Sequence, residues 1–311
     1  MSQPPFLPRY LGHATFMRMP VWQPGEAADI AMVGVPFDGG VTNRPGARHG
    51  PREVRNSSSL IRRVSQATGH NPFAAARIVD AGDVHIERPY NLSDAHADIE
   101  SAFHGWRDAG LCTLAVGGDH SVSLPILRAV ARDRAPLGLV HIDAHCDTGD
   151  ENGGSRFHHG APFRRAVEEG LIDPNRTVQI GIRSTLSEPG QWQFSFDSGM
   201  RVIPIEEVYR NGLDAAIAVA RRVAGDGPCY VSFDIDSVDP AFAPGTGTPE
   251  IGGLTSLEAL LLVRGLSGLN VAGADVVEVA PAYDPTNNTA FLAANIMFEL
   301  LCLMTGQRPP G

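Results

Sequence analysis

The chain has 311 residues, of which 43% are hydrophobic and 19% are charged, and its formal net charge at pH 7 is −10. This apolar content is enough for one large core, and no apolar run has the length of about 20 residues that a transmembrane helix needs. The negative charge disfavours a nucleic-acid partner, because phosphate binding needs a basic surface. The N-terminus also lacks the pattern of a secretion signal, so we expect a cytoplasmic protein without a membrane partner.

All 25 basic side chains are arginine, because the sequence contains no lysine. This excludes Schiff-base chemistry, the phosphate-binding lysine of a P-loop and a carbamylated lysine between two metal ions. The four cysteines lie at positions 112, 146, 229 and 302 without a CxxC pair, which favours reduced core thiols over disulfides or a zinc ribbon. Catalysis must therefore use Asp, Glu, His, Arg or a metal ion.

Apolar runs with high β-propensity recur along the chain and alternate with helical patterns. We predict strands over residues 30–36, 77–82, 112–118, 137–143, 177–183, 201–205, 228–234 and 271–279. Helices are predicted over residues 123–134, 161–169, 213–224 and 256–266, among others. Most strand runs are continuously apolar, which is typical of strands covered on both faces. The alternation therefore predicts an α/β fold in which helices cover both faces of a parallel sheet.

Three long loops rich in Gly and Pro, over residues 37–51, 149–160 and 239–253, interrupt this pattern. Ligands of open parallel sheets bind beyond the carboxyl ends of the strands, so we expect these loops to form the rim of a binding crevice. No linker, repeat or low-complexity tract divides the sequence. We therefore predict a single domain over residues 1–311, with an N-terminal arm at about residues 1–28.

Four segments that contain carboxylates and histidines follow the ends of predicted strands. They are GGDH, which ends at His120, HIDAHCD from His141 to Asp147, SFDID from Ser232 to Asp236, and DVVEV around Glu278. Burial of so many carboxylates is unfavourable unless they share hydrogen bonds or cations. A metal centre is therefore the predicted role of these segments.

Six side chains in these segments are candidate metal ligands. Asp143, His145 and Asp147 share parity, so an extended segment would direct them to one side, and Asp234 and Asp236 repeat this spacing. Two imidazoles and four carboxylates suit two divalent ions with bridging carboxylates, and the absence of a thiolate favours Mn²⁺, with Ni²⁺ or Co²⁺ as alternatives. Such a pair would generate a nucleophilic hydroxide near neutral pH. The predicted ligands are His120, Asp143, His145, Asp147, Asp234 and Asp236.

Two residues within HIDAHCD are not expected to bind the metal ions. His141 lies deeper in the predicted strand, where a histidine bonded within the core is the expected role. Cys146 should face away from the ligands because side chains alternate along an extended segment.

GGDH, DAHCD, SFDIDSVDP and PGTGTPEIGG resemble the ureohydrolase family of arginases, agmatinases, guanidinobutyrases and guanidinopropionases, over nearly the whole chain. NRPGARHGPREVRN, HGAPFRRAVEEG and DVVEVAP are more similar to the guanidinopropionase and guanidinobutyrase branch than to arginase. The resemblance implies a three-layer α/β/α sandwich around an eight-stranded, mostly parallel sheet. It also implies a trimer or hexamer, with a hetero-oligomer that contains a paralogue as an alternative.

The resemblance also implies roles for individual residues. His120, Asp143, Asp147 and Asp234 match the ligands of one manganese ion, and Asp143, His145, Asp234 and Asp236 match those of the other. Asp143 and Asp234 would bridge the two ions. His159 corresponds to the proton shuttle and Glu278 to the carboxylate that holds the guanidinium, so the candidate catalytic residues are Asp147, His159 and Glu278. The alternatives are His158 as the shuttle and a structural role for Glu278.

These roles match the needs of guanidinium hydrolysis. The planar, resonance-stabilised cation needs a strong nucleophile, a carboxylate that orients it and a proton for the departing amine. We therefore predict hydrolysis of a small guanidino acid, such as guanidinopropionate or guanidinobutyrate, to urea and an amine. A catalytically silent subunit of a hetero-oligomer is an alternative of another class. A deacetylase of similar architecture is a third, but its mononuclear zinc site needs fewer ligands.

The loops of the rim should select the substituent on the guanidine. A carboxylate tail would pair with Arg156 or Arg44, whereas a cationic or alkyl tail would prefer Asp150, Glu151 and Phe157. Phe157 departs from the residue usual in the branch and Cys146 from the residues usual in the family, so an alkylguanidine or a biguanide such as dimethylbiguanide is an alternative substrate. Agmatine is a further alternative. The candidate substrate-binding residues are Glu278, Arg156, Phe157, Glu151, Asn43, Arg44 and Thr246.

Overall fold

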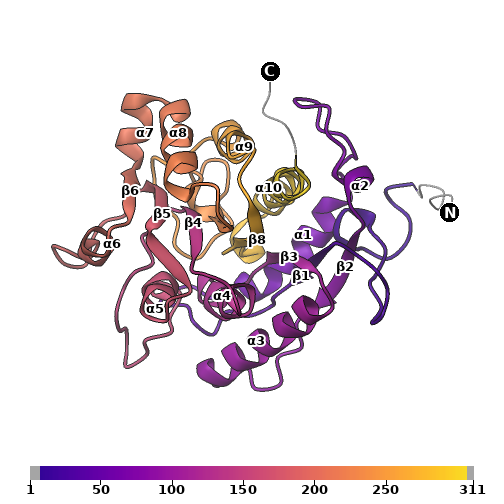
Figure 1. The fold of residues 1–311 in the computed structure, drawn as a ribbon, viewed down its shortest axis with the longest axis horizontal. Coiled ribbons are helices and arrows are strands. Elements are labelled where there is room, and N and C mark those ends of the chain that lie inside the picture. The colour runs from indigo at the N-terminus through magenta and orange to yellow at the C-terminus, as the bar shows by residue number, and fades with distance from the viewer. Residues whose placement is uncertain (1–7, 307–311) are drawn as a thin grey trace.

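The computed structural model describes residues 8–306, which form an eight-stranded sheet with helices on both sides (Figure 1). The strands are β1 (Ile30–Gly34), β2 (Ile78–Asp83), β3 (Cys112–Val116), β4 (Leu137–Ile142), β5 (Ile172–Ile182), β6 (Arg201–Pro204), β7 (Cys229–Asp234) and β8 (Val271–Val277). Their order is β2-β1-β3-β8-β7-β4-β5-β6, and each neighbouring pair is parallel. The predicted fold class is therefore confirmed.

Each predicted strand is present, although several ends differ. The largest difference is in β5, which begins at Ile172 rather than at residue 177. The intervening sequence DPNR is polar and partly exposed, so it has no apolar run that would mark a strand. Backbone pairing between Leu137 and Ile172 nevertheless begins the parallel ladder there.

The helices form a layer on each face of the sheet. They are α1 (Gly50–Ser58), α2 (Pro72–Ala75), α3 (Leu92–Asp108), α4 (Ser123–Ala131), α5 (Pro162–Glu168), α6 (Gln193–Ser198), α7 (Ile205–Asn211), α8 (Leu213–Ala224), α9 (Ser256–Gly265) and α10 (Asn288–Met304). Helices α3, α4 and α5 cover one face, and α1, α7, α8, α9 and α10 cover the other (Figure 1). The four helices predicted by range correspond to α4, α5, α8 and α9.

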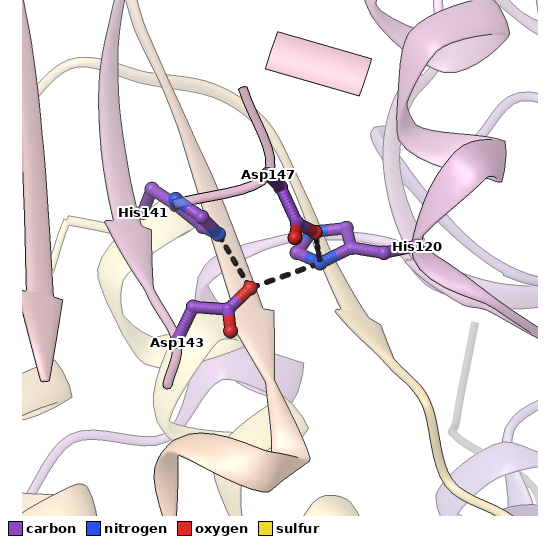
Figure 2. A group of neighbouring side chains, drawn as sticks. All are labelled: His120, His141, Asp143 and Asp147. Atoms are coloured by element: carbon purple, nitrogen blue, oxygen red, sulfur yellow. Dashed lines mark hydrogen bonds and ion pairs between the residues drawn. The ribbon is translucent and has the colours of Figure 1, made fainter. Parts of the chain in front are cut away.

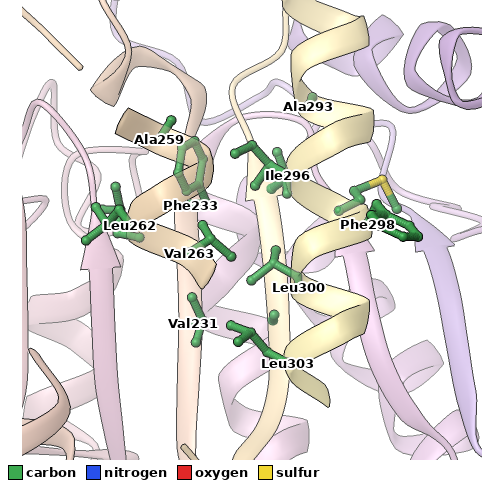
Figure 3. Packing of buried hydrophobic residues seen from close by; sticks show 14 of the residues in the cluster. Val231, Phe233, Ala259, Leu262, Val263, Ala293, Ile296, Phe298, Leu300 and Leu303 are labelled. Atoms are coloured by element: carbon green, nitrogen blue, oxygen red, sulfur yellow. The ribbon is translucent and has the colours of Figure 1, made fainter. Parts of the chain in front are cut away.

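Each face of the sheet has its own hydrophobic core. Val231 and Phe233 of β7 point toward α9 and α10, where they pack with Leu262 and Ile296 (Figure 3). Tyr230 of the same strand belongs to the core on the opposite face. Burial of each large aliphatic or aromatic side chain contributes roughly 1.5–3 kcal/mol, so strands covered on both sides anchor the sheet firmly.

The N-terminal segment packs against the edge of this sheet. Residues 1–7 of the predicted arm lie outside the described residues. Within the rest, the backbone N–H of Phe16 donates to Oδ2 of Asp80 at 2.7 Å, and that of Met17 donates to Oγ of Ser58 at 2.8 Å. None of the helices in residues 8–306 combines the length and apolar character that would let it span a bilayer.

Four central strands bring the functional segments together. Strands β3, β8, β7 and β4 are consecutive neighbours, so β8 lies in the middle of the sheet although it comes last in the chain. The register pairs Val116 with Val276, Asp234 with Val277, and Ile142 with Phe233. Because all four strands are parallel, their carboxyl ends lie at one edge of the sheet, as the motif positions predicted.

Candidate metal centre and active site

His120 is positioned by a tight turn after β3. A side chain cannot fit at Gly118, because a Cβ there would lie 1.5 Å from the carbonyl oxygen of Phe37. The same carbonyl accepts the backbone N–H of Asp119 at 2.9 Å, and Oδ1 of Asp119 accepts that of Ser121 at 2.9 Å. The chain then enters a 3₁₀ turn over His120–Val122, in which His120 is fully buried.

Similar turns follow β4 and β7. Oδ1 of Asp143 accepts the backbone N–H of His145 at 2.6 Å, and Oδ1 of Asp234 accepts that of Asp236 at 2.8 Å. These carboxylates stabilise turns by binding the N–H two residues further on. The prediction that both segments are extended is therefore wrong: β4 ends at Ile142, and a 3₁₀ turn over Ile235–Ser237 follows β7. Turn geometry, rather than strand parity, brings the side chains together.

Three carboxylates surround Nδ1 of His120. Oδ2 of Asp143 lies 3.1 Å from this nitrogen, Oδ2 of Asp147 lies 2.9 Å away, and Oδ2 of Asp234 lies 3.1 Å away. Figure 2 shows dashed lines that join His120 to both Asp143 and Asp147, and Asp143 also to His141. These side chains come from the ends of β3, β4 and β7, so half of the candidate centre is built at three strand ends.

The second half of the centre surrounds His145. Its Nδ1 lies 3.1 Å from Oδ2 of Asp236 and 3.4 Å from Oδ1 of Asp143. Asp143 therefore directs one carboxylate oxygen toward each imidazole. In the described part of the chain, two groups of side chains could hold a metal ion, and Asp143 belongs to both groups. The structure thus brings the six predicted ligands into one cluster.

His141 and Cys146 lie beside this cluster. The side-chain amide nitrogen of Gln179 lies 3.0 Å from Nδ1 of His141, whose Nε2 lies 2.7 Å from Oδ2 of Asp143. Since the amide donates, Nδ1 accepts and the neutral ring donates its Nε2 proton to Asp143. Although Nε2 lies close enough to join a ligand group, these bonds are those of a core histidine. Cys146 packs against Ile182 and Val202 and belongs to neither group.

The electrostatics of the cluster favour a cation. Burial raises the pKa of Asp234 well above its usual value, and the nearby carboxylates of Asp236 and Asp143 raise it further. Burial opposes protonation of His120, but the carboxylates of Asp143, Asp147 and Asp234 outweigh it and raise its pKa well above the usual value. Although three carboxylate oxygens lie 2.9–3.1 Å from Nδ1 of His120, none of them has the geometry of a hydrogen bond to this nitrogen within the described residues. Two imidazoles, carboxylate oxygens and no thiolate fit a hard or borderline divalent metal ion.

A cavity of about 400 Å³ lies beside the cluster. Its lining includes the candidate ligands His145, Asp147, Asp234 and Asp236, and both His159 and Glu278. The predicted ligands and the predicted catalytic groups therefore share one cavity, which is open to a small substrate.

Glu278 and His159 form a buried pair in this cavity. Oε1 of Glu278 lies 2.8 Å from Nδ1 of His159 and accepts the backbone N–H of His120 at 2.9 Å. Oε2 of Glu278 is buried and has no hydrogen-bond partner in residues 8–306. Burial opposes a proton on His159, but the charge and hydrogen bond of Glu278 outweigh it and raise the pKa to about 9. Glu278 therefore favours the protonated form of the imidazole.

Two of the candidate catalytic residues have strained backbones. Asp147 has φ 51° and Glu278 has φ 65°, both in the left-handed region that favours glycine. This conformation costs roughly 1–2 kcal/mol for a residue with a side chain, and such strain is concentrated at functional sites. The turns that aim these two carboxylates therefore have an energetic cost that the surrounding packing must offset.

The structure separates the predicted substrate-binding residues into two sets. Glu278 and Glu151 line the cavity. Arg156 lies outside it, where Nη2 contacts Oε2 of Glu168 at 3.0 Å and Oδ1 of Asp150 at 3.5 Å. Its guanidinium is thus already engaged by two carboxylates.

The remaining predicted substrate-binding residues also lie outside the cavity lining. Phe157 packs into the core, with its ring centroid 6.0 Å from that of His96. Nη2 of Arg44 donates to the carbonyl oxygen of Thr246 at 2.9 Å, and Thr246 is buried. Asn43 is exposed beside the cavity residue Thr42. Direct roles for these residues stay predictions.

Sequence reasoning missed several residues that contact the centre. Oγ1 of Thr42 lies 2.8 Å from Nε2 of His159, and Oε1 of Glu250 lies 3.7 Å from Nε2 of His145. Both lie in loops that were predicted only as the rim. Asp275 is fully buried in β8, where one acidic residue within an apolar run was a signal that could have been used.

The parallel sheet, the His and Asp cluster that could hold a metal ion, and the Glu278–His159 pair are together typical of a metal-dependent hydrolase. The Arginase family model matches residues 28–303. The chain is 54% identical over 299 residues to guanidinopropionase of Pseudomonas aeruginosa, covering 96% of this chain and 93% of that protein. It is 48% identical to a mitochondrial agmatinase of Gallus gallus, covering 97% of this chain and 88% of that protein.

A solved structure shows the same architecture. Proclavaminate amidino hydrolase from Streptomyces clavuligerus superposes with a TM-score of 0.93 at 42% identity, covering 97% of this chain and 100% of that chain. The chain belongs to the arginase family and is a ureohydrolase, which is a hydrolase that acts on C–N bonds. The resemblance inferred from the motifs is confirmed.

Proposed function

We propose that this protein hydrolyses a small guanidino acid to urea and an amine at a centre with two divalent metal ions. The main support is Glu278, whose Oε2 is buried without a hydrogen-bond partner among the described residues, next to the ligand cluster. A guanidinium presents paired N–H donors that match a carboxylate. The similarity to guanidinopropionase supports the guanidino acid as substrate class.

The six clustered side chains would hold the two ions. His120, Asp143, Asp147 and Asp234 would bind one ion, and Asp143, His145, Asp234 and Asp236 the other. The orientation of Asp143, with one oxygen toward each imidazole, supports a bridging role. When bound, the ions supply the Lewis acidity that makes water a strong nucleophile near neutral pH. We propose Mn²⁺ because oxygen ligands dominate, with Ni²⁺ or Co²⁺ as alternatives.

The residues of the chain would orient the substrate and supply the proton. Glu278 would hold the guanidinium, so that its carbon faces the ligand cluster. His159 would donate a proton to the departing amine as the C–N bond breaks, and its pKa of about 9 keeps that proton available at neutral pH. Nε2 of His159 contacts Oγ1 of Thr42, a residue that lines the cavity.

The cavity lining favours a second candidate substrate class. It contains Glu151 and Glu188, as well as Asp150, which is already paired with Arg165 at 2.8 Å, and no arginine is present among the described residues that line it. An acidic lining attracts a cationic tail and disfavours a carboxylate. Agmatine, an alkylguanidine or a biguanide is therefore the second candidate, and the similarity to an agmatinase supports it.

A urea-release assay over a substrate panel tests both candidates. The purified protein is supplied with Mn²⁺ or Ni²⁺, its metal content is measured, and kcat/KM is compared for guanidinopropionate, guanidinobutyrate, agmatine, an alkylguanidine and dimethylbiguanide. We expect a guanidino acid to exceed the others by at least about ten-fold, or 1.4 kcal/mol. A preference of that size for another tail selects the second candidate.

The same assay has an outcome that contradicts the proposal. Two bound ions without urea from any substrate would identify a catalytically silent subunit, and a single zinc ion would favour deacetylase-type chemistry. Glu278→Gln is the control, because loss of the shared guanidinium contact should depress turnover of every substrate.

We also propose a trimer or hexamer as the assembly, with a hetero-oligomer containing a paralogue as the alternative. The support is the membership of the arginase family. Light scattering of the purified chain tests this, because a monomer would contradict the homo-oligomer and would prompt a search for a partner chain.

A further inference from the structure

Asp275 is a buried carboxylate that the proposed mechanism does not use. It is fully buried in β8 and accepts hydrogen bonds from three hydroxyl groups. Oγ of Ser232 donates to Oδ1 at 2.7 Å, while Oγ of Ser123 and the hydroxyl of Tyr230 donate to Oδ2 at 2.6 and 2.9 Å. Within residues 8–306, no ion pair joins it to an arginine or a histidine. Burial of such a carboxylate is costly, so its presence suggests a function.

Ser232 connects this carboxylate to His120. Ser232 and Asp275 are paired across β7 and β8, and Oγ of Ser232 lies 2.8 Å from Nε2 of His120. A serine hydroxyl has one hydrogen, and an ionised carboxylate only accepts. Ser232 therefore donates to Asp275 and must accept from the Nε2–H of His120. In a neutral imidazole, this leaves Nδ1 with its lone pair free.

Nδ1 is the nitrogen that faces the candidate metal ligands. It lies 2.9–3.1 Å from oxygens of Asp143, Asp147 and Asp234. A histidine binds a metal ion through an unprotonated nitrogen, and the hydrogen bond of the other nitrogen selects the tautomer. The path of hydrogen bonds from Asp275 through Ser232 to His120 thus selects the tautomer of His120 that metal coordination requires.

We propose that Asp275 is a positioning residue that acts through Ser232 to hold His120 in the orientation and tautomer that bind a divalent cation. This inference rests on the proposed metal centre. It assigns a role to a fully buried carboxylate that lies outside the cavity lining and that accepts three hydroxyl hydrogen bonds.

The other two hydroxyls on Asp275 offer matched controls. Tyr230 and Ser123 also donate to Asp275, but neither contacts His120 through a described hydrogen bond. Tyr230→Phe and Ser123→Ala each remove one bond to the carboxylate and leave the path through Ser232 in place. These variants separate a general packing effect from an effect on His120.

Asp275→Asn is the most specific perturbation. An asparagine amide keeps the shape of the side chain but can donate to Ser232, which then donates to Nε2 of His120. The neutral imidazole would carry its proton on Nδ1, much as Asp→Asn in a Ser-His-Asp triad imposes the wrong tautomer. We expect affinity for Mn²⁺ to fall by about 10–100-fold, the range typical of lost outer-sphere partners. Ser232→Ala should act similarly, and the double variant should be no worse than Asp275→Asn, because both changes interrupt one path.

Binding of Mn²⁺ to the metal-free full-length chain measures the effect. Calorimetric titration gives the affinities and the number of ions for the wild type and each variant, and thermal unfolding in chelator reports metal-free stability. We expect Asp275→Asn and Ser232→Ala to weaken one of two ions, while Tyr230→Phe and Ser123→Ala stay within about three-fold of the wild type. Ser232→Thr, which keeps the hydroxyl, should bind Mn²⁺ more tightly than Ser232→Ala.

Two results would overturn the proposal. One is unchanged Mn²⁺ affinity in both Asp275→Asn and Ser232→Ala, and the other is an equal loss in Tyr230→Phe, which would indicate packing alone. If Asp275→Asn does not fold, Ser232→Ala decides the question. A wild-type chain that binds no Mn²⁺, Ni²⁺ or Co²⁺ would instead contradict the proposed metal centre, so the two failures are distinguishable.

Discussion

The candidate metal centre and the rim of the cavity beside it differ in how their side chains are held. In the centre, His120, Asp143 and Asp234 lie close to the carboxyl ends of β3, β4 and β7, and each is at most 3% exposed at its side chain. On the rim, Arg156 and Asp150 lie on a loop and are 53% and 51% exposed. The central groups are held by the sheet itself, whereas the rim depends on loops. We therefore expect the groups held by the sheet to carry out the reaction and the loops to select the substrate.

The two halves of the centre differ in their exposure to solvent. The imidazole of His120 is 1% exposed and is supported by Ser232 and Asp275. That of His145 is 25% exposed, and the carboxylate beyond it, Glu250, belongs to a loop and is 27% exposed. The half of the centre at His145 is therefore more exposed to solvent than the half at His120. We expect an ion bound at His145 to exchange more readily.

The largest effect should come from a carboxylate that serves both halves of the centre. Asp143→Asn or Asp234→Asn should release both ions and lower kcat/KM by at least about 10⁴-fold, or 5.5 kcal/mol. Asp236→Asn should mainly release the ion beside His145, because Asp236 contacts that half alone. Metal analysis with urea release measures this. Equal loss of both ions in all three variants would refute the division into bridging and terminal ligands.

The next effect concerns His159, which belongs to the centre but should not bind a metal ion. His159→Ala should lower kcat by about 10²–10⁴-fold with unchanged metal content, because general acid catalysis contributes that much. His158→Ala, which changes the neighbouring histidine, should have a smaller effect. Loss of metal from His159→Ala would identify it as a ligand, and a larger effect at His158 would make that residue the shuttle.

The pH dependence of kcat sharpens the role of His159. Glu278 raises the pKa of His159 to about 9 although burial opposes this, so the acid form persists through neutral pH. Activity that needs this proton should be present below that value and should fall as the pH rises through about 9. A decline centred near pH 6.5, the ordinary histidine value, would argue against the coupling to Glu278. The measurement is kcat at saturating substrate and constant metal concentration.

Chelation tests whether the two halves of the centre hold their ions with different affinity. Dialysis of the holoenzyme against increasing chelator should pass through a species with one ion per chain, because the half at His145 is the more exposed. We expect affinities that differ by about ten-fold or more, which outer-sphere support alone can supply. The remaining ion should be lost more easily in Ser232→Ala. Simultaneous release of both ions would show that the shared carboxylates, rather than the different burial of the two halves, determine how the ions are lost.

The same division explains what the sequence could predict. Continuous apolar runs mark strands buried on both faces, so all eight strands and the meeting of the four segments followed from patterns alone. Helix α10 is buried on nearly every side and lacks a polar face, so periodicity could not mark it. The turns after Asp143 and Asp234 depend on single side-chain bonds, which strand parity does not describe. The placement of Arg156 and Arg44 depends on contacts across the tertiary structure, which the sequence does not specify.

The smallest effect should come from Arg156. Its guanidinium contacts Glu168 and Asp150 outside the cavity lining, so Arg156→Ala should change kcat/KM for guanidinobutyrate by less than about three-fold, a loss typical of exposed ion pairs. A direct bond to a substrate carboxylate would instead cost about 1.5–3 kcal/mol, or roughly 10–150-fold, for guanidino acids alone. An alkylguanidine measured with the same variant is the control, because it has no carboxylate to lose. Selective loss on the acid would bring Arg156 into the substrate site and show that the rim rearranges when substrate binds. Equal, small changes on both substrates would indicate that Glu151 and its neighbours in the cavity, rather than Arg156, bind the tail of the substrate.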